Sequence, residues 1–207
     1  RKLILATSKD IRVLLVKIAD RLHNMRTIKA FDSFDKQKRI AKETMEIYAP
    51  LADRMGMNRI RDELEDLSFD ILNNQARNLI KERLRFIKNN REDTFKTISS
   101  NLIELLKTQG ISARIAGREK TAFSIWRKMQ NKKISLEQLT DIVGFRIIVA
   151  DVNDCYKTLG VFHSKFSAIP GKFKDYISTP KINKYRSIHT SVIGPQKQRI
   201  EIQIRTN

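Results

Sequence analysis

Apolar side chains recur at helical spacing through the first part of the chain. Residues 11–25 carry an apolar position every three or four residues, which predicts a helix with Ser8 as its N-cap. Residues 35–48 repeat the pattern, with Pro50 as the expected bend and Gly56 as the expected stop. Each stretch therefore presents one apolar face to a core.

The helical pattern continues to about residue 107. Asn58 is the expected N-cap of the next helix. Residues 75–107 predict one or two further helices, interrupted at about Asn89 and Asn90. The first part of the chain is therefore predicted to be all-helical.

After Gly110 the periodicity becomes mixed. Residues 111–117 and 143–150 are apolar and β-branched and predict strands, whereas residues 121–130 and 153–166 predict helices. We therefore expect an α+β fold, in which a helical N-terminal region is followed by a mixed β-sheet with flanking helices.

The end of the chain predicts a β-hairpin. Residues 189–193 and 199–205 are strand-like and flank the turn-like residues 194–197. In the last strand polar and apolar positions alternate, so one face carries Ile200, Ile202 and Ile204 and the other carries Glu201, Gln203 and Arg205. A polar sheet face that carries an acid is thus expected.

Composition limits the class of protein. The chain has 207 residues, of which 41% are apolar and 31% charged, an ordinary globular balance that can bury a core. The single cysteine, Cys155, excludes an internal disulfide and a cysteine-built zinc site and favours a reducing, cytoplasmic setting. Because no apolar run approaches the roughly 18 to 20 residues of a membrane span, we expect a soluble protein without membrane contact. The uncapped ends predict a chain cut from a longer one.

Charge is the most informative property of the composition. The net charge is +18 and the pI is near 10.2, which favours a polyanionic partner. Residues 117–207 carry 17 basic and 7 acidic side chains, and after Gly160 the only acids are Asp175 and Glu201. This pattern fits phosphate ligands, and composition does not choose between nucleic acid and nucleotides.

Two carboxylates are candidate metal ligands and proton acceptors. Asp141 precedes a predicted buried strand, and Glu201 projects from the polar face of another. Brought together by a sheet, they would hold Mg²⁺ against a triphosphate, and one would also accept a proton from an attacking hydroxyl. The alternative is that Asp141 pairs with a nearby Lys or Arg and Glu201 is merely solvated.

Basic and aromatic residues suggest places for phosphates and a nucleobase. Four cations follow Gly117 at a strand-to-helix junction, where N–H groups and side chains hold phosphates well: Arg118, Lys120, Arg127 and Lys128. Residues 167–187 predict a long functional loop, in which lysines 172, 174, 181 and 184 accompany Tyr185. His189 is a candidate phosphate donor. A solvated loop and a structural histidine are the alternatives.

One polar cluster lies in the helical part. Its members fall at helical offsets of three and four: Lys17, Asp20, His23 and Asn24. The cluster contributes one metal carboxylate or is a surface network. A zinc or manganese centre needs three or more protein ligands, and no other histidine occurs before His163, so any metal site here is incomplete within the chain.

Dispersed motifs resemble the Rel/SpoT family of bifunctional (p)ppGpp synthetases and hydrolases, the alarmone enzymes of the stringent response. In the first part of the chain, the matching segments are 17–27, 43–52 and 63–67. In the second part they are 117–120, 124–129, 141–146, 172–176, 181–189 and 201–206. The segments keep the family's order and span almost the whole chain.

The resemblance implies two modules. Residues 1–95 would be a partial HD-type hydrolase domain with connecting helices, which uses Mn²⁺ to remove the 3′-pyrophosphate. Residues 96–207 would be a nucleotidyltransferase-like synthetase without its C-terminal end, which uses Mg²⁺ to move pyrophosphate from ATP to the 3′-hydroxyl of GDP or GTP. ATP and GDP or GTP are the implied partners, and this segment does not imply ribosome association.

The resemblance also implies residue roles. ATP would be bound by Arg118, Lys120, Ser124 and Lys128. The acceptor would be bound by Lys174, Lys181, Asn183, Tyr185 and His189, with the tyrosine stacked on guanine. Asp141 and Glu201 would hold Mg²⁺, and Glu201 would activate the 3′-hydroxyl. Asp20 would be the remnant of a Mn²⁺ site, with Asn24 beside it.

The chain departs from the family pattern at several positions. The HD histidines lie upstream in the family, so we expect no hydrolysis by this chain alone, and a separate polypeptide is a possible source of the rest. Lys184 and Arg186 replace Gly and Gln beside Tyr185, and residues 121–123 replace a usual His and Tyr. We expect weak or no turnover. The alternatives are a catalytically dead module that binds nucleotides or RNA, left from a split bifunctional enzyme, and a remnant without function.

Overall fold

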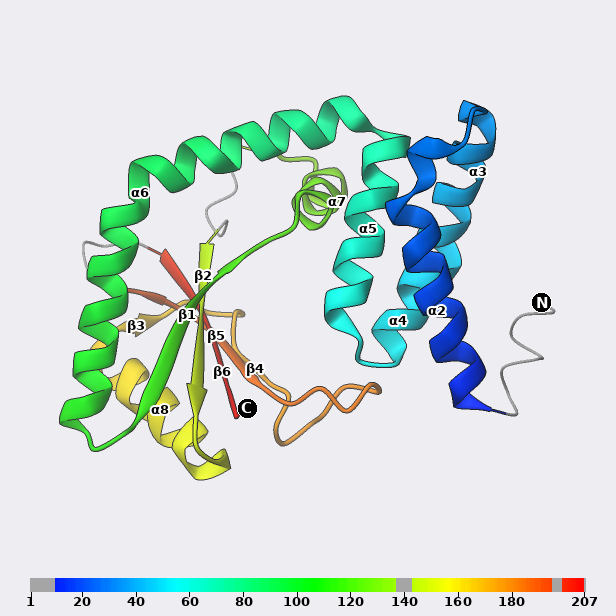
Figure 1. Ribbon diagram of the computed structural model, residues 1–207. Helices are drawn as coiled ribbons and strands as arrows, with labels where there is room; N and C mark the ends of the chain where they lie inside the picture. The colour runs from blue at the N-terminus through cyan, green and yellow to red at the C-terminus, as the bar shows by residue number, and fades with distance from the viewer. Residues whose placement is uncertain (1–9, 137–142, 195–198, 207) are drawn as a thin grey trace. The chain divides into compact units, whose positions relative to one another are not determined.

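The computed structural model describes residues 10–136, 143–194 and 199–206 (Figure 1). It divides into two compact units, residues 1–79 with 121–123 and residues 80–120 with 124–207. The predicted boundary between residues 95 and 96 falls inside a helix, and as a boundary between functional modules it stays a prediction. None of the described helices is both long and apolar enough to cross a membrane.

The first unit is helical, as predicted (Figure 1). Its elements are α2 (Ile11–Arg26), η1 (Ile28–Ala30), α3 (Phe34–Glu43), the π-helical turn η2 (Thr44–Tyr48), α4 (Ala49–Arg54), α5 (Asn58–Leu72) and the start of α6 (Asn74–Thr108). Ile18, Met25 and Leu64 are fully buried in its core, which supplies most of the stabilisation of short helices.

The local signals for helix ends are partly confirmed. Gly56 has a φ of 73° and terminates α4 as predicted. Pro50 lies in the first turn of α4, where the missing N–H of proline is tolerated, and the π turn η2 precedes it; the bend predicted at Pro50 stays a prediction. The cap of α2 is Asp10, whose carboxylate accepts from the Arg12 N–H, and Ser8 lies outside the described residues.

Two predictions about the later helices are wrong. Asn58 is the first residue of α5 rather than its cap, and its side chain donates to the carbonyl of Gly56. The expected interruption at Asn89 and Asn90 does not occur, because α6 runs from Asn74 to Thr108 as one helix. The low helix propensity of asparagine is a weak preference, which a long helix tolerates.

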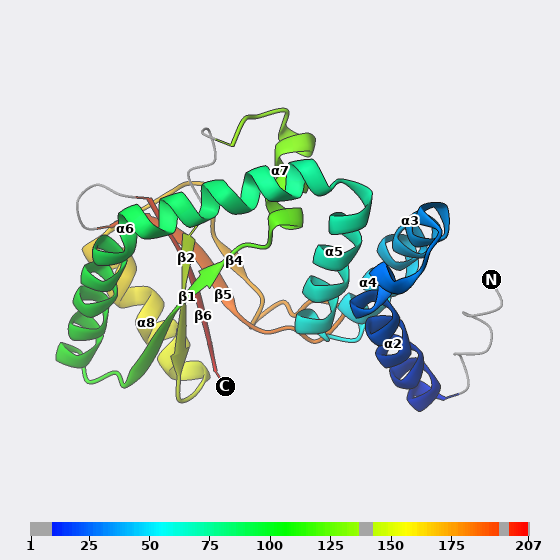
Figure 2. The same ribbon diagram turned by 45° about the horizontal axis from the view of Figure 1, so that its top comes forward.

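The second unit is a mixed β-sheet with helices, so the predicted α+β class is confirmed (Figure 2). Its further elements are β1 (Ala113–Glu119), α7 (Ala122–Lys132), β2 (Val143–Val149), α8 (Val152–Lys165), β3 (Ser167–Ala168), β4 (Lys174–Asp175), β5 (Ile188–Ile193) and β6 (Arg199–Thr206). The sheet order is β1-β2-β6-β5-β3, with β4 also paired to β5. Only β2 and β6 are parallel among the described pairs. Residues 167–187, predicted as a loop, thus contain two short strands.

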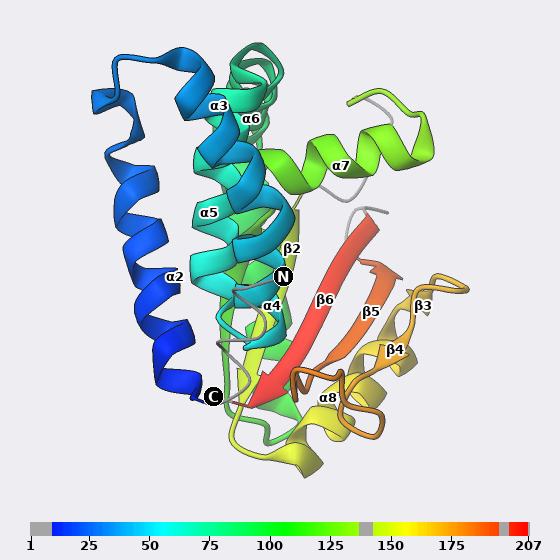
Figure 3. The same cartoon turned by 90° about the vertical axis from the view of Figure 1, so that its right-hand side faces the viewer.

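The sheet has one apolar face and one polar face. Ile200, Ile202 and Ile204 of β6 are 0–2% exposed and pack with α6 and α8 in one core, which confirms the predicted alternation. The predicted hairpin is confirmed as well, since β5 and β6 are antiparallel and lie side by side (Figure 3). Helices α6 and α8 therefore cover the apolar face.

Gly117 lies within β1 and is required by packing. A Cβ atom at this position would lie 2.7 Å from the ring of Phe95, which stacks on Phe145 with ring centroids 4.6 Å apart. The glycine therefore lets α6 approach β1 closely. Sequence reasoning placed Gly117 at a phosphate-binding junction, whereas the strand continues to Glu119.

Candidate functional site

The strand register arranges polar residues in rows across the polar face. One row runs through β1, β2, β6 and β5 and contains Arg118, Gly144, Glu201 and Ser191. The next row runs through the same strands and β4 and contains Ala116, Arg146, Gln203, His189 and Lys174. Side chains of paired residues emerge on the same face of a sheet, so strands that are distant in sequence contribute to one surface.

Glu201 forms an ion pair with Lys120 in the first row. The Lys120 ammonium donates to Oε2 of Glu201 over 2.8 Å, and the two side chains are 19% and 23% exposed. Lys120 follows β1 directly, so the end of that strand brings it to β6. Lys120, which is predicted to bind ATP, thus contacts Glu201, which is predicted to be catalytic.

A small pocket surrounds this pair. Its lining residues are Lys120, Gly144, Phe145, Glu201 and Gln203. A Cβ atom on Gly144 would lie 3.3 Å from the backbone oxygen of Glu201, which is tighter than most such contacts. Glycine therefore keeps β2 close to the carboxylate and leaves the pocket open.

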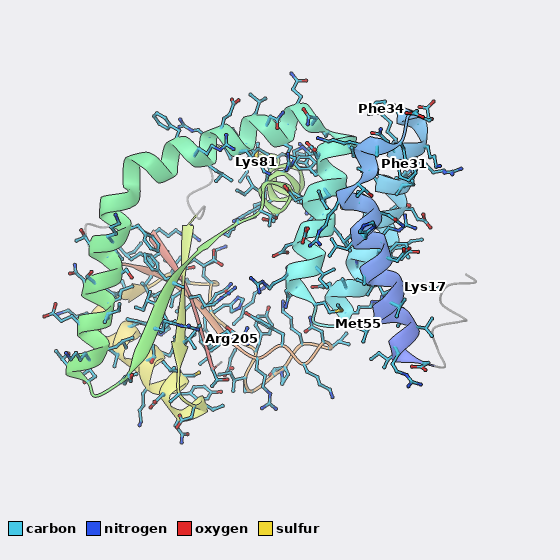
Figure 4. The ribbon with its side chains drawn as sticks, in the orientation of Figure 1. Lys17, Phe31, Phe34, Met55, Lys81 and Arg205 are labelled. Atoms are coloured by element: carbon cyan, nitrogen blue, oxygen red, sulfur yellow. The ribbon has the colours of Figure 1, made fainter. Side chains whose placement is uncertain are left out.

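A second cluster is aromatic and lies at the β5 end of the polar face. The Tyr185 hydroxyl lies 3.0 Å from Nε2 of His189, and Tyr176 meets both rings edge-on at centroid distances of 6.1 and 5.2 Å. The Lys181 ammonium lies 4.7 Å from the ring centre of Tyr176 and 5.3 Å from that of Tyr185. Arg205, labelled in Figure 4, lies 6.0 Å from the Tyr185 ring. Cations over ring faces form a site suited to a flat, anionic ligand.

The loop before Tyr185 has a strained backbone. Lys184 has a φ of 58°, the left-handed region in which glycine is favoured, and its N–H donates to the carbonyl of Lys181 over 2.8 Å. Oδ1 of Asn183 accepts from the Tyr185 N–H over 3.2 Å. Lys184, where the resemblance implies a glycine, therefore occupies a conformation that glycine adopts more easily.

The carboxylate of Asp175 organises the turn after β4. Oδ1 accepts from the N–H groups of Ile177 and Ser178 over 2.8 and 3.0 Å, and Oδ2 accepts from the Tyr156 hydroxyl over 3.0 Å. Burial opposes ionisation, but these N–H and O–H donors outweigh it and lower the pKa of Asp175. Burial and the nearby carboxylate raise the pKa of Tyr156, so its phenol stays a donor.

Other predicted residues are placed less completely. Asp141 lies outside the described residues, and Arg118 is placed by its strand register alone. Ser124 and Lys128 lie one turn apart on α7, where both fall on the same face of the helix. The roles of all these residues stay predictions.

The polar cluster of the helical unit lies on α2, on which Figure 4 labels Lys17. The Asn24 amide donates to Oδ2 of Asp20 over 3.2 Å. The two residues are four positions apart, so their side chains lie one helical turn apart on the same face of α2. Within the described residues, no group of three or more His, Cys, Asp or Glu side chains is close enough to hold a metal ion. The expected incomplete Mn²⁺ site therefore stays a prediction.

Sequence reasoning missed several members of the polar face. Tyr176 and Arg146 were not selected, although they lie near or on the rows described above, and neither was Tyr156, which donates to Asp175 from α8. The two-residue strand β4 is too short to give a periodic signal for Tyr176. The tyrosine directly follows the lysine and aspartate of the 172–176 motif, which is the signal that would have identified it.

Comparisons with known proteins agree with the motifs. Residues 117–207 match the region found in RelA / SpoT proteins, and residues 1–58 match an HD domain. The GTP pyrophosphokinase rsh of Brucella melitensis is 53% identical over 206 residues, which is 100% of this chain and 27% of the relative. The bifunctional (p)ppGpp synthase/hydrolase SpoT of Escherichia coli is 46% identical over 100% of this chain and 29% of the relative.

Among the solved structures that this chain matches is the small alarmone synthetase 1 of Bacillus subtilis bound to its product pppGpp. It is 27% identical, covers 61% of this chain and 74% of its own, and has a TM-score of 0.45. The chain spans less than a third of the length of the curated relatives named above. The dispersed motifs, the two family-model matches and the identity over its whole length show that the chain belongs to the Rel/SpoT family.

Proposed function

We propose that the sheet unit carries the synthetase site of a (p)ppGpp enzyme, which transfers pyrophosphate from ATP to the 3′-hydroxyl of GDP or GTP. The observation that carries this proposal is the row in which Glu201, paired with Lys120, projects from the polar face among basic residues. The names of the relatives, a GTP pyrophosphokinase and a (p)ppGpp synthase/hydrolase, support it.

Glu201 would act as the proton acceptor. The 3′-oxygen attacks the β-phosphorus of ATP, the bond from that phosphorus to the α,β-bridging oxygen breaks, AMP leaves, and the hydroxyl proton passes to the carboxylate. Lys120 now neutralises that carboxylate over 2.8 Å. The phosphates of ATP would compete with Glu201 for the Lys120 ammonium. Bound ATP would therefore weaken the ion pair and leave the Glu201 carboxylate able to accept the hydroxyl proton.

The remaining ATP contacts would come from Arg118, Ser124 and Lys128. A transferred pyrophosphate carries several negative charges, and fixed cations stabilise it chiefly by position and electrostatics. Oxygen donors suit Mg²⁺, and Glu201 fits such a site together with Asp141. When bound, the ion would neutralise charge on the triphosphate.

The aromatic cluster would receive the acceptor nucleotide. Tyr185 would stack on guanine, and its ring position is fixed by the contact with His189. Lys174, Lys181, Asn183 and His189 would contact the rest of the nucleotide. Lys181, whose ammonium lies 4.7 and 5.3 Å from the centres of two tyrosine rings, would meet both a base and its phosphates.

The helical unit would be part of the 3′-pyrophosphohydrolase. Asp20, with Asn24 beside it, would contribute one oxygen ligand to a Mn²⁺ site whose other ligands come from outside this chain. Hydrolysis would need that further part, from the same or a separate polypeptide. A cytoplasmic location fits these nucleotide substrates and the buried thiol of Cys155.

The test is turnover with ATP, Mg²⁺ and GDP or GTP, followed as AMP and a 3′-pyrophosphorylated product. We expect Glu201→Gln and Asp141→Asn each to lower the rate at least about 100-fold, because each removes an acid–base or metal-binding oxygen. Product formation that survives either substitution would refute the assigned roles. Lys157→Met, on the far side of the sheet on α8, is the matched control.

A binding measurement covers the case of weak turnover. A synthetase site predicts tighter binding of GDP than of ADP in the presence of a non-hydrolysable ATP analogue. The RNA-binding alternative, supported by the charge of +18, predicts instead that affinity for RNA falls linearly with log salt and shows no such guanine preference.

A further inference from the structure

A side-chain hydrogen bond from Tyr156 connects helix α8 to Asp175, at the start of the turn after β4. Tyr156 lies on α8 and donates its hydroxyl proton to Asp175 on β4 over 3.0 Å. The residue before it, Cys155, is fully buried in the sheet core, as is Phe162 further along the helix. The phenol therefore projects from a helix whose position is fixed by packing.

Asp175 connects Tyr156 to the backbone of the turn that follows β4. The same carboxylate accepts from the backbone N–H groups of Ile177 and Ser178, and the Tyr176 N–H donates to the carbonyl of Ser187 over 2.9 Å. Successive residues of a strand project to opposite faces, so Lys174 lies on the side opposite to Asp175, and the ring contacts of Tyr176 with Tyr185 and His189 place it on the side of Lys174. The register pairs Lys174 with His189, which is the polar face.

Tyr176 in turn borders the aromatic cluster. Its ring meets His189 at a centroid distance of 5.2 Å and Tyr185 at 6.1 Å, both edge-on, and it shares Lys181 with Tyr185. A movement of this ring would change the space available to Tyr185 and His189. The chain of contacts thus runs from the core through Tyr156 and Asp175 to the proposed acceptor site.

We infer that Tyr156 and Asp175 form a latch that holds Lys174 and Tyr176 in place, and that both latch residues are positioning residues for the acceptor nucleotide. The inference rests on the proposed function, because the acceptor site is part of it. Neither latch residue needs to touch a nucleotide, since their effect passes through the turn and the Tyr176 ring.

The central test is Tyr156→Phe, which removes the donor and keeps the ring. We expect the Kd for GDP, measured with a non-hydrolysable ATP analogue present, to rise about three- to tenfold, while the Kd for ATP stays unchanged. Asp175→Asn should have a similar effect, and the double variant should be no worse than either single one. An unchanged Kd for GDP, or strictly additive effects, would overturn the latch. Lys157→Met is the matched control on the same helix.

A second measurement does not depend on nucleotide binding. The chain has three histidines, and the ring protons of His189 report its contacts with Tyr176 and Tyr185 in NMR spectra. In Tyr156→Phe we expect the His189 signals to shift or broaden, while those of His23 stay fixed. Unchanged His189 signals would overturn the latch. If wild type shows no guanine preference but the signals shift, the proposed function fails and the latch stands as a structural device.

Discussion

The helical unit and the sheet unit use positive charge in different ways. In the helical unit, Arg77 lies between Asp66 and Asp70 with contacts of 2.6 and 3.0 Å, and Arg26 donates twice to Glu63. Cations lie over aromatic rings in both units: Arg21, which also pairs with Glu43, lies over Tyr48 in the helical unit, and Lys181 and Arg205 lie over tyrosine rings on the polar sheet face. A carboxylate neutralises the charge of its cation, whereas a ring does not, so a cation held by rings alone keeps a net charge that an anionic ligand can meet.

The largest expected difference in stability is between Arg77 and Lys120. Arg77→Met should lower the free energy of unfolding by about 2 kcal/mol, because it leaves two partly buried carboxylates without their donor. Lys120→Met should lower it by less than about 1 kcal/mol, because it leaves one carboxylate of similar burial, rather than two, without this donor. Urea titrations of both variants provide the measurement.

The exposed pair of the helical unit is the control for this comparison. Arg26 is 56% exposed and its partner Glu63 40% exposed, so Arg26→Met should cost no more than about 0.5 kcal/mol. Equal losses for Arg77→Met and Lys120→Met would remove the distinction between structural and ligand-directed charge.

A smaller effect on stability is expected at Lys184, whose backbone is strained in the loop before Tyr185. Because its φ is 58°, Lys184→Gly should be more stable than Lys184→Ala by about 1 kcal/mol, since alanine keeps the side-chain clash and glycine relieves it. Thermal unfolding of the two variants decides this. If alanine were as stable as glycine, the loop would carry no strain of this kind.

The smallest effect concerns pH. The pKa of Asp175 is lower in the folded chain than in the unfolded one, so its stabilisation is present above the unfolded value and is lost as pH falls through the folded value. The loss should begin below about pH 4 and stay under about 1 kcal/mol, because the group is close to solvent. Wild type should therefore lose more stability than Asp175→Asn on acidification, and parallel curves would contradict this.

The regular elements could be predicted because burial leaves a periodic trace. The alternation of β6 identified which face lies in the core, and the helical stripes of residues 11–25 and 35–48 identified the first unit. Boundaries were less accessible: β1 begins at Ala113 rather than Ile111, because pairing with β2 defines its extent.

Contacts between distant residues could not be read from local patterns. The pairing of Lys120 with Glu201 follows from the parallel register of β2 and β6, which no sequence period encodes. Tyr176 escaped notice for a similar reason, since its significance comes from three rings that meet only in the folded sheet. The sequence motifs identified candidate residues for the site, whereas the strand register determines which of them lie next to one another.

The position of β6 has a consequence for biosynthesis. This strand comes after the other described strands in the sequence, yet it lies between β2 and β5 in the middle of the sheet. A nascent chain that has reached only β5 has two unpaired strand edges and lacks Glu201, so it is exposed to aggregation and proteolysis. A sheet without β6 therefore lacks both the candidate carboxylate and the pairing that joins β2 to β5.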